Sequence, residues 1–409
     1  MGERKGAAVT TRSPEVSEAF QTGWNGEPPP RKKEMTVGST KMPTAIDLFS
    51  GCGGLTSGLR SAGFEVLAAI EKDSDSANTY TANHRSVVVY NKDIRRVTAK
   101  SLLERLGLEK GELDLVAGCP PCQGFTRLTE KSLRNDPRNE LIYEYLRFVR
   151  VLRPQVCMLE NVPGLLSRGK EIFDDFCAGV ESLGYIINCQ VLELADYGVP
   201  QFRKRLVMLA GLGRKIEIPP PTHCDPLAGR TASQRPWRTV QQAIRFLPRP
   251  PRRSRVVAGK THPRYRWHFS RDITRDVRLR LLYAIDSGKG RVALPPSLRL
   301  KCHQRHPNGY YDVYGAMSWD SPSPTITSGC TNASKGRFGH PSSPRPLTAT
   351  EAAKLQTFPL TYKFEGSGLE SVAVQIGNAL PKRFATVIGR AVVAQLTDSG
   401  VGSKVVQQQ

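Results

Sequence analysis

The sequence lacks several features that define whole classes of protein. None of its apolar runs approaches the ~20 residues that a membrane-spanning helix requires. It has no amino-terminal segment of the secretory type, and its nine cysteines follow no regular spacing. These absences exclude a membrane protein and argue against a disulfide framework. We therefore expect a soluble protein with free thiols in a reducing compartment.

Acidic residues are scarce in this chain of 409 residues. There are 37 Asp and Glu against 59 Lys and Arg, which gives a formal net charge of +22. Residues 231–310 alone carry 19 Lys and Arg and only three acids, so +16 of the net charge falls there. Such an imbalance favours an anionic partner, nucleic acid first. The sequence thus indicates a basic module inside a near-neutral protein.

Short apolar runs alternate with amphipathic stretches from Thr44 onwards, which predicts a doubly wound parallel α/β sheet. The runs that we expect to be strands are 44–50, 64–71, 86–91, 113–118, 154–162, 185–194 and 204–212. The expected helices are 53–62, 73–83, 137–152, 168–183, 348–358 and 375–395.

Two segments do not show this alternation of apolar runs and amphipathic stretches. Residues 1–41 are polar and rich in proline and glycine, so we expect a disordered tail. Residues 219–345 are dense in Pro, Arg, Ser and Gly, which predicts a loop-rich second domain with short strand-like pieces such as 309–319.

A glycine-rich turn follows the first predicted strand, in the run Asp47-Leu48-Phe49-Ser50-Gly51-Cys52-Gly53-Gly54. Glycines let a backbone approach a ligand, and the amides at the start of a helix favour an anionic group. Glu71, 20 residues after Gly51, can accept hydrogen bonds from ribose hydroxyls. Asp93 can face an adenine amino group. The alternatives are a tight turn without ligand and a solvated loop acid.

The fourth predicted strand runs into Cys119-Pro120-Pro121-Cys122-Gln123-Gly124-Phe125. Three interpretations remain open for this pair of cysteines: a redox pair, half of a zinc site, or a nucleophile held by the two prolines. No second Cys-x-x-Cys follows, and Cys302, His303 and His306 lack a fourth partner at the usual spacing.

The next strand ends in Glu160-Asn161-Val162-Pro163-Gly164, which places a carboxylate beside the fourth-strand cysteine in a parallel sheet. The default alternative for such a glutamate is a solvated or turn-capping role. Gln201-Phe202-Arg203-Lys204-Arg205 leads into the last strand. Arginines that enter a buried strand need partners, so we expect Arg203 and Arg205 to point into a polar cleft.

Together these motifs resemble the DNA (cytosine-5) methyltransferase family, over residues 44 to 390 and in the family's order. "DLFSGCGG" resembles the loop for S-adenosylmethionine, "PPCQGF" the nucleophile loop, and "ENVPGLL" and "QFRKR" the motifs around the target base. "RPLTATEAAKLQTFP" is similar to the helix that supports the recognition domain, and "QIGNALP" to the closing cofactor motif. Cys119, where glycine is more usual, and Lys354, where arginine is common, depart from the pattern.

The resemblance implies a Rossmann-like methyltransferase core with a smaller, inserted target-recognition domain. It divides the chain into a tail (1–41), a catalytic domain (42–218), a target-recognition domain (219–345), a supporting helix and C-terminal segment that complete the catalytic domain (346–396) and a flexible tail (397–409).

It also implies the chemistry of the site. Cys122 would add as a thiolate to C6 of a flipped-out cytosine, so that C5 can accept the methyl group before the C5 proton and the cysteine leave. Glu160 would protonate or hydrogen-bond N3, Arg205 would contact O2, and Arg203 would help to hold the phosphate and the loop. The remaining implied contacts are Phe49, Gly51, Glu71, Asp93, Pro121, Asn378 and Ala379 for the cofactor, and Gln123, Asn161, Gln201 and Thr325 for the substrate.

The resemblance further implies S-adenosylmethionine as methyl donor, no metal and double-stranded DNA as the partner, with a cognate restriction endonuclease as a further candidate. We expect a monomer in the bacterial cytoplasm, at the nucleoid when on DNA. A tRNA cytosine-5 methyltransferase is the nearest alternative, although the tRNA-directed members are typically compact where residues 219–345 lie. A DNA-recognition protein without catalysis is the second alternative, and a redox or zinc protein is a distant third.

Overall fold

The computed structural model describes residues 42–121, 138–229, 231–255, 266–305 and 311–402. The predicted tail 1–41 lies outside these residues, as do Cys122 and Gln123. No helix in the described ranges has the length and apolarity that a bilayer crossing demands.

A seven-stranded sheet forms the centre of the fold, in the order β3-β2-β1-β4-β5-β7-β6. Its strands are β1 (Thr44–Leu48), β2 (Glu65–Glu71), β3 (Val88–Asn91), β4 (Leu115–Gly118), β5 (Val156–Asn161), β6 (Tyr185–Glu193) and β7 (Lys204–Leu212). Every strand expected from the apolar runs is present, and the order reverses beside β1, as in doubly wound folds. The predicted fold class is therefore confirmed.

One strand departs from the predicted parallel arrangement. β7 pairs antiparallel with both β5 and β6. The connection between β6 and β7 spans only residues 194–203, which is too short for the crossover that parallel neighbours need.

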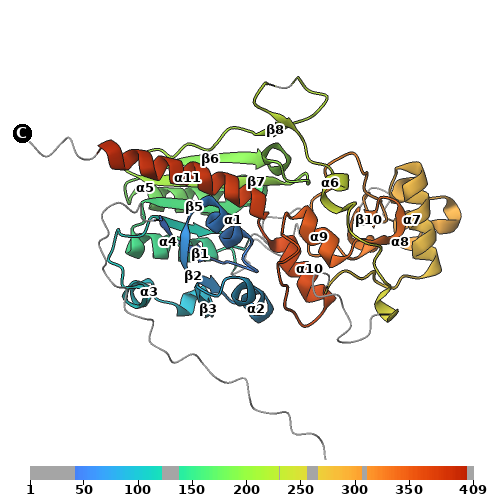
Figure 1. Ribbon diagram of the computed structural model, residues 1–409, viewed down its shortest axis with the longest axis horizontal. Coiled ribbons are helices and arrows are strands. Elements are labelled where there is room, and N and C mark those ends of the chain that lie inside the picture. Colours follow the sequence, from blue (N-terminus) through green and yellow to red (C-terminus); the bar gives the residue numbers. More distant parts are fainter. Residues whose placement is uncertain (1–41, 122–137, 230, 256–265, 306–310, 403–409) are drawn as a thin grey trace, which may run out of the picture. The chain divides into compact units, whose positions relative to one another are not determined.

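Helices cover both faces of the sheet (Figure 1). One buried core joins the sheet to α3 (Ala99–Leu106), α4 (Leu141–Leu152) and α5 (Lys170–Glu181). A second core joins its other face to α1 (Gly54–Ala62), α2 (Ser74–Asn83) and α11 (Lys382–Gly402). Of these, α3 was not expected from the sequence; it has eight residues, of which three are buried.

The carboxy-terminal helix packs along α1 at close range. A Cβ at Gly58 would lie 2.3 Å from the Ala385 Cβ, and one at Gly389 would lie 2.8 Å from the Ala62 Cβ. Glycine at both crossing points lets the two backbones approach. α11 therefore completes the sheet's second face although it follows the inserted segment in sequence.

The insert is loop-rich, as predicted, but it is not without helices. It holds α6 (Val240–Ile244), α7 (Arg275–Ser287) and α8 (Lys301–Arg305), with the short strands β8 (His223–Cys224), β9 (Arg235–Pro236), β10 (Gly339–His340) and β11 (Ser343–Pro346). Its main core is shared with α9 (Ala349–Leu355) and α10 (Leu369–Asn378).

Two local predictions were wrong. The stretch 375–395 is not one helix, because α10 ends at Asn378 and α11 begins at Lys382. Pro381 lies between them and disfavours helical conformation in the residue before it. In the described part of 309–319 there is no strand, only an isolated bridge between Ala316 and Gly339.

Candidate active site

The loop after β1 departs sharply from strand geometry. Phe49 has a φ of 59°, and Gly51 and Gly53 have φ values of 53° and 89°. A bulky side chain rarely adopts this left-handed conformation, and such strained positions cluster at ligand sites. A Cβ at Gly53 would lie 2.8 Å from atoms of His84 and Tyr362. Glycine is therefore required at this point of the loop.

Tyr362 ties this loop to the carboxy-terminal part of the chain. Its hydroxyl donates to the carbonyl oxygen of Cys52 at 2.6 Å and lies 3.1 Å from His84 Nε2. Neither Tyr362 nor His84 was predicted as a site residue, since nothing in the local sequence signals a contact between residues so far apart.

Glu71 lies at the end of β2, as predicted, and its carboxylate holds the loop. One oxygen accepts the Gly51 amide at 2.8 Å and the other accepts the Asp73 amide at 2.7 Å. Burial raises the pKa of Glu71 above its ordinary value. Each oxygen keeps a second lone pair, so ribose hydroxyls can still donate to it.

Asp93 follows β3, but cations already engage its carboxylate. Arg95 approaches it at 2.8 Å and Lys72 at 3.1 Å. The hydrogen bond from the Arg95 side chain is the main reason that the pKa of Asp93 lies well below its usual range. An adenine amino group would have to share this carboxylate with Arg95.

Asp47, inside β1, is an acid that sequence reasoning did not single out. Its side chain is fully buried, and Oδ2 accepts the Thr56 hydroxyl at 2.6 Å. Oδ1 is buried with no hydrogen-bond partner among the described residues. Burial raises the pKa of Asp47 to about 7. A charged residue within an otherwise apolar strand is the sequence signal that could have revealed it.

This acid should make stability depend on pH. Since the folded-state pKa of Asp47 is raised to about 7 from 3.8, the folded chain binds this proton more tightly than the unfolded chain does. Stability from this group should therefore fall as pH rises from 5 to 8, by about 2–3 kcal/mol. Urea unfolding at both values should show that fall, and Asp47→Asn should flatten it. An equal fall in the variant would contradict the assignment.

Glu160 and Arg205 form an ion pair at the edge of the sheet. Arg205 Nε lies 2.7 Å from Glu160 Oε1, and both side chains are nearly buried. Cys119 lies beside them at the end of β4: burial, and then the charge of Glu160, raise the pKa of its thiol well above the ordinary value. The predicted neighbourhood of this cysteine and the β5 glutamate is confirmed. A thiol kept protonated in this way is a poor nucleophile.

Asn161 connects β5 to the loop that leads to Cys122. Its amide nitrogen donates to the carbonyl of Pro120 at 3.3 Å, and its oxygen accepts the Val162 amide at 2.8 Å. Its side chain therefore orients the segment in which Pro121 immediately precedes Cys122. Cys122 and Gln123 themselves lie outside the described residues.

Residues 201–203 lead into β7, and we call them the β7 entrance. Gln201 and Arg203 connect this entrance to two distant segments. Arg203 is buried and donates to the carbonyls of Ile326 at 2.8 Å and Gly377 at 3.1 Å. The Gln201 oxygen accepts the Ile326 amide at 2.8 Å. Thr325, its neighbour, donates its hydroxyl to the Phe202 carbonyl at 2.7 Å. The structure thus brings Gln201, Arg203 and Thr325 together.

Gln356 is a further residue that was not predicted from the sequence. Its fully buried side chain accepts from Gln201 at 2.8 Å and donates to the carbonyls of Ile376 at 2.6 Å and Ala379 at 3.2 Å. It therefore links the end of α9, the end of α10 and the β7 entrance. The amide sits among residues that are neighbours only in the fold, so no local pattern marks it.

The closing motif reaches the glycine-rich loop from the other side. A Cβ at Gly54 would lie 2.5 Å from the Leu380 carbonyl and 3.3 Å from the Ala379 Cβ. Ala379 is buried, whereas Asn378 is exposed at the end of α10. The closing motif is therefore adjacent to the glycine-rich loop at Gly54.

The basic insert carries a cavity of about 960 Å³. Five arginines in its lining have no carboxylate within 4.0 Å among the described residues: Arg245, Arg249, Arg252, Arg275 and Arg278. Other arginines of the insert are occupied, as in the pairs Arg266–Glu365 and Arg271–Glu370. Only part of the insert's positive charge is therefore available to a ligand.

No group of three or more His, Cys, Asp or Glu side chains suited to a metal ion comes together in the part of the chain that the structure describes.

Comparison with known proteins agrees with this geometry. The model of the C-5 cytosine-specific DNA methylase family matches residues 44–394. The Type II methylase M.HgiDII of Herpetosiphon aurantiacus is 35% identical over 359 residues, covering 85% of this chain and 94% of the relative. The Type II methyltransferase M.AgeI of Thalassovita gelatinovora is 30% identical over 423 residues, covering 85% and 97%.

Solved structures share the fold at lower identity. A candidate DNA modification methyltransferase encoded within an E. coli prophage gives a TM-score of 0.63 at 23% identity, covering 87% of this chain and 99% of that one. The Entamoeba histolytica methyltransferase EhMeth gives a TM-score of 0.56 at 17% identity, covering 87% and 99%. The family match extends over both the sheet and the insert, so the chain belongs to the C-5 cytosine-specific DNA methylase family.

Proposed function

We propose that this protein transfers a methyl group from S-adenosylmethionine to C5 of a cytosine within a specific sequence of duplex DNA, with Cys122 as the nucleophile. The observation that carries the proposal is the Glu160–Arg205 pair, 2.7 Å apart, beside the loop that enters Cys122. An acid and an arginine at that position can hold N3 and O2 of a flipped cytosine.

The loop after β1 suits S-adenosylmethionine, which supplies the methyl group when bound. A Cβ at Gly51 would meet no atom of the described residues within 4 Å, so none of them fills the space beside the loop there. Asp47 offers a buried oxygen without a partner among the described residues, which a cationic group or a water would satisfy. We assign Phe49, Gly51, Glu71, Asp93, Pro121, Asn378 and Ala379 to this ligand.

The remaining residues divide into contact and positioning roles. We assign Gln123 and Thr325 to the substrate and its flanking phosphate, and we retain Asn161 and Gln201 as substrate-binding candidates. The hydrogen bonds of Asn161, Gln201 and Arg203 to backbone groups support a positioning role for their side chains. We propose no catalytic metal.

We propose residues 219–345 as the target-recognition domain, between a catalytic domain (42–218) and the segment 346–396 that completes it. Arginine side chains suit both phosphates and guanine edges. We further propose a monomer that acts in the bacterial cytoplasm, where its DNA lies, as the methyltransferase of a restriction–modification system with a cognate endonuclease. The Type II names of its relatives support this assignment.

Neutralising the insert's free arginines should weaken DNA binding alone. We expect Arg249→Gln, Arg252→Gln and Arg278→Gln together to lower the slope of log affinity against log salt by about 0.9 for each phosphate that the protein no longer neutralises. Affinity for S-adenosylmethionine should not change. Fluorescence anisotropy across a salt series and calorimetry measure the two quantities, and an unchanged salt slope would remove this cavity from the DNA interface.

The proposed function is tested by methylome sequencing of a host that expresses the protein. The expected result is 5-methylcytosine at one position of one sequence. Labelled methyl transfer from S-adenosylmethionine to purified duplex DNA and to tRNA provides the second measurement. Incorporation into tRNA alone would replace the proposal by its nearest alternative, and incorporation into neither would leave a recognition protein without catalysis.

A further inference from the structure

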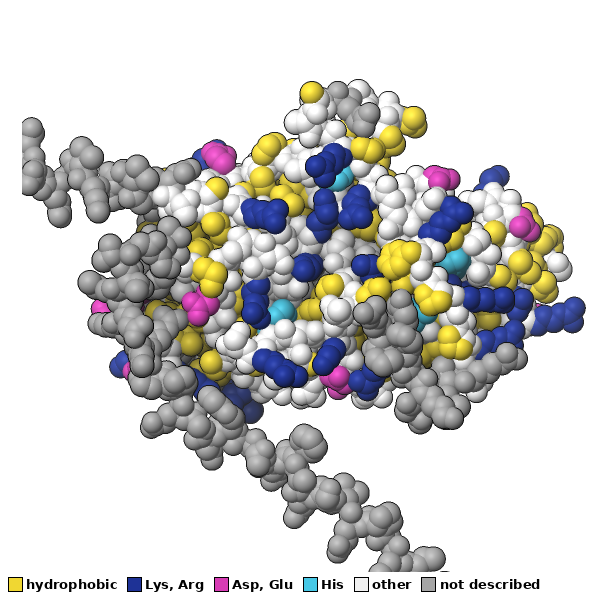
Figure 2. Space-filling model, viewed as in Figure 1, with side chains coloured by type: hydrophobic (Ala, Val, Ile, Leu, Met, Phe, Trp, Pro, Cys, Tyr) yellow, Lys and Arg dark blue, Asp and Glu magenta, His cyan; other side chains and the backbone are white. Residues whose placement is uncertain are grey.

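Cations gather on the face of the sheet that α1, α2 and α11 cover. Figure 2 shows that Lys and Arg side chains far outnumber Asp and Glu there. We call one connected group the basic band: Arg60, Arg85, Arg235, Arg238, Lys354, Lys363, Lys382, Arg383 and Arg390. In the described ranges, none of these side chains has a carboxylate within 4.0 Å. Seven of the nine lie outside residues 231–310.

One end of the band lies beside the proposed active site. The ring of Trp237 packs edge-on against Phe202, with 5.0 Å between centroids, and Phe202 belongs to the β7 entrance. Arg383 Nε and a carbon of the His223 ring both lie 2.6 Å from the Cβ position of Gly198. Burial, and then the charges of Arg383 and its neighbours, lower the pKa of His223 to about 4. Like charges are thus held close together, and the nearby carboxylate of Asp196 accepts the Trp237 ring N–H at 2.8 Å.

The middle of the band lies at the start of α11. Lys382 and Arg383 open this helix, whose first turn contains no acid. Cations at a helix amino terminus oppose its macrodipole, whereas an anion there is favoured. Burial lowers the pKa of Lys354, and repulsion from Arg238 and Lys382 lowers it further. An anion bound here would offset both the unfavourable interaction of these cations with the helix macrodipole and the repulsion at Lys354.

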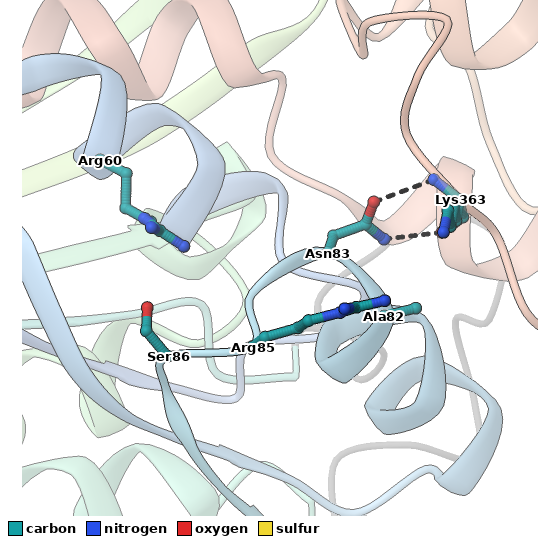
Figure 3. Close-up of a pocket in the computed structure, with 6 residues that line it drawn as sticks. All are labelled: Arg60, Ala82, Asn83, Arg85, Ser86 and Lys363. Atoms are coloured by element: carbon teal, nitrogen blue, oxygen red, sulfur yellow. Dashed lines mark hydrogen bonds between the residues drawn. The ribbon is translucent and has the colours of Figure 1, made fainter.

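The other end of the band is a pocket of about 420 Å³ on α1 and α2 (Figure 3). Its lining contains no acid: Arg60, Ala82, Asn83, Arg85, Ser86 and Lys363. Figure 3 shows Arg60 and Lys363 on opposite sides, with Arg85 between them. Asn83 fixes the Lys363 backbone through bonds of 2.7 and 2.9 Å, so the lysine is presented from a rigid base. Burial, and then the charges of Arg60 and Lys382, lower the pKa of His84 to about 4. His84 therefore lies between the pocket and the middle of the band.

We propose that the basic band binds the phosphate backbone of DNA outside the recognition sequence. The inference rests on the proposed function, in which duplex DNA is the substrate. It adds a second surface of the protein that contacts this DNA. A linear polyanion matches an extended row of cations of one sign, whereas a free anion would occupy only one point of it. The band begins next to the β7 entrance, so a duplex held there can continue along α11 towards the pocket.

The test replaces the three cations of the pocket, Arg60→Gln, Arg85→Gln and Lys363→Gln, whose side chains are all exposed. Binding is measured on a short duplex that covers the recognition sequence, and on a duplex extended by ~20 bp on each side, which stays nearly straight. The variant should bind the short duplex like wild type. On the long duplex it should bind at least about tenfold more weakly at 0.15 M salt, since each phosphate left without its cation costs on the order of fivefold.

A control variant, Lys100→Gln, Arg150→Gln and Lys170→Gln, removes the same charge from the opposite face, on α3, α4 and α5. It should match wild type on both duplexes. Equal binding of the wild type and the pocket variant to the long duplex would overturn the proposal. So would a pocket variant that binds DNA like the wild type and loses only its binding to an acidic protein. Failure of wild type to methylate the short duplex would instead overturn the proposed function, so the two failures are distinguishable.

Discussion

Replacing Cys122 by alanine is expected to abolish methyl transfer, whereas Cys119→Ala should retain activity within about tenfold of wild type. C5 of cytosine is a weak nucleophile, so the reaction depends on a thiolate that adds to C6. Burial and the charge of Glu160 keep the Cys119 thiol protonated, which makes it unsuited to that addition. The loss for Cys122→Ala should exceed ~10³-fold.

The measurement is transfer of labelled methyl groups to duplex DNA, with DNA binding as a check that each variant is folded. A trapped covalent complex with DNA containing 5-fluorocytosine should form with wild type and Cys119→Ala but not with Cys122→Ala. Equal losses in the two variants would show that both thiols take part, and the assignment of Cys122 as sole nucleophile would be wrong.

Gly377→Ala should be the most damaging change away from the nucleophile. A Cβ there would lie 2.2 Å from Ser328 N and from the carbonyl carbon of Thr327. These are backbone atoms, so α10 or the 325–328 segment has to move. That displacement breaks the bond from Arg203 to the Gly377 carbonyl and shifts Thr325 from the β7 entrance. We expect a loss of at least ~2 kcal/mol in unfolding free energy and a large drop in kcat.

Gly229→Ala is the matched control, since a Cβ at Gly229 meets no atom of the described residues within 4 Å and its φ lies outside the left-handed region. Urea unfolding and steady-state methylation should distinguish the two variants. If Gly377→Ala unfolds and methylates like Gly229→Ala, the close approach of α10 to residues 327–328 is not required for the site.

The sheet could be predicted because its signal is local. Central strands of a parallel sheet are continuous apolar runs, and all seven runs from 44–50 to 204–212 became strands. The neighbourhood of Cys119 and Glu160 followed as well, since the carboxyl ends of adjacent parallel strands meet at one edge. The direction of β7 did not follow from its apolar pattern, and Pro381 divided a pattern that predicts a single helix.

The connections between motifs could not be predicted, because they join residues far apart in the chain. Gln356 bonds to Gln201 across 155 positions, and Arg203 to the Gly377 carbonyl across 174. Tyr362 holds the Cys52 carbonyl across 310 positions. Such contacts depend on how the insert and α9 to α11 return to the sheet, and sequence periodicity carries no information about that.

The amino-acid sequence alone determined the fold class, the order of the motifs and the excess of positive charge in residues 231–310. Each of these is a property of neighbouring residues or of composition. Only the tertiary structure decided which cations lack a carboxylate partner and where they gather. It pairs Arg266 and Arg271 of the insert with glutamates, and it collects cations of the near-neutral remainder on one face. Net charge adds along the chain, whereas an electrostatic surface depends on distances in the folded molecule.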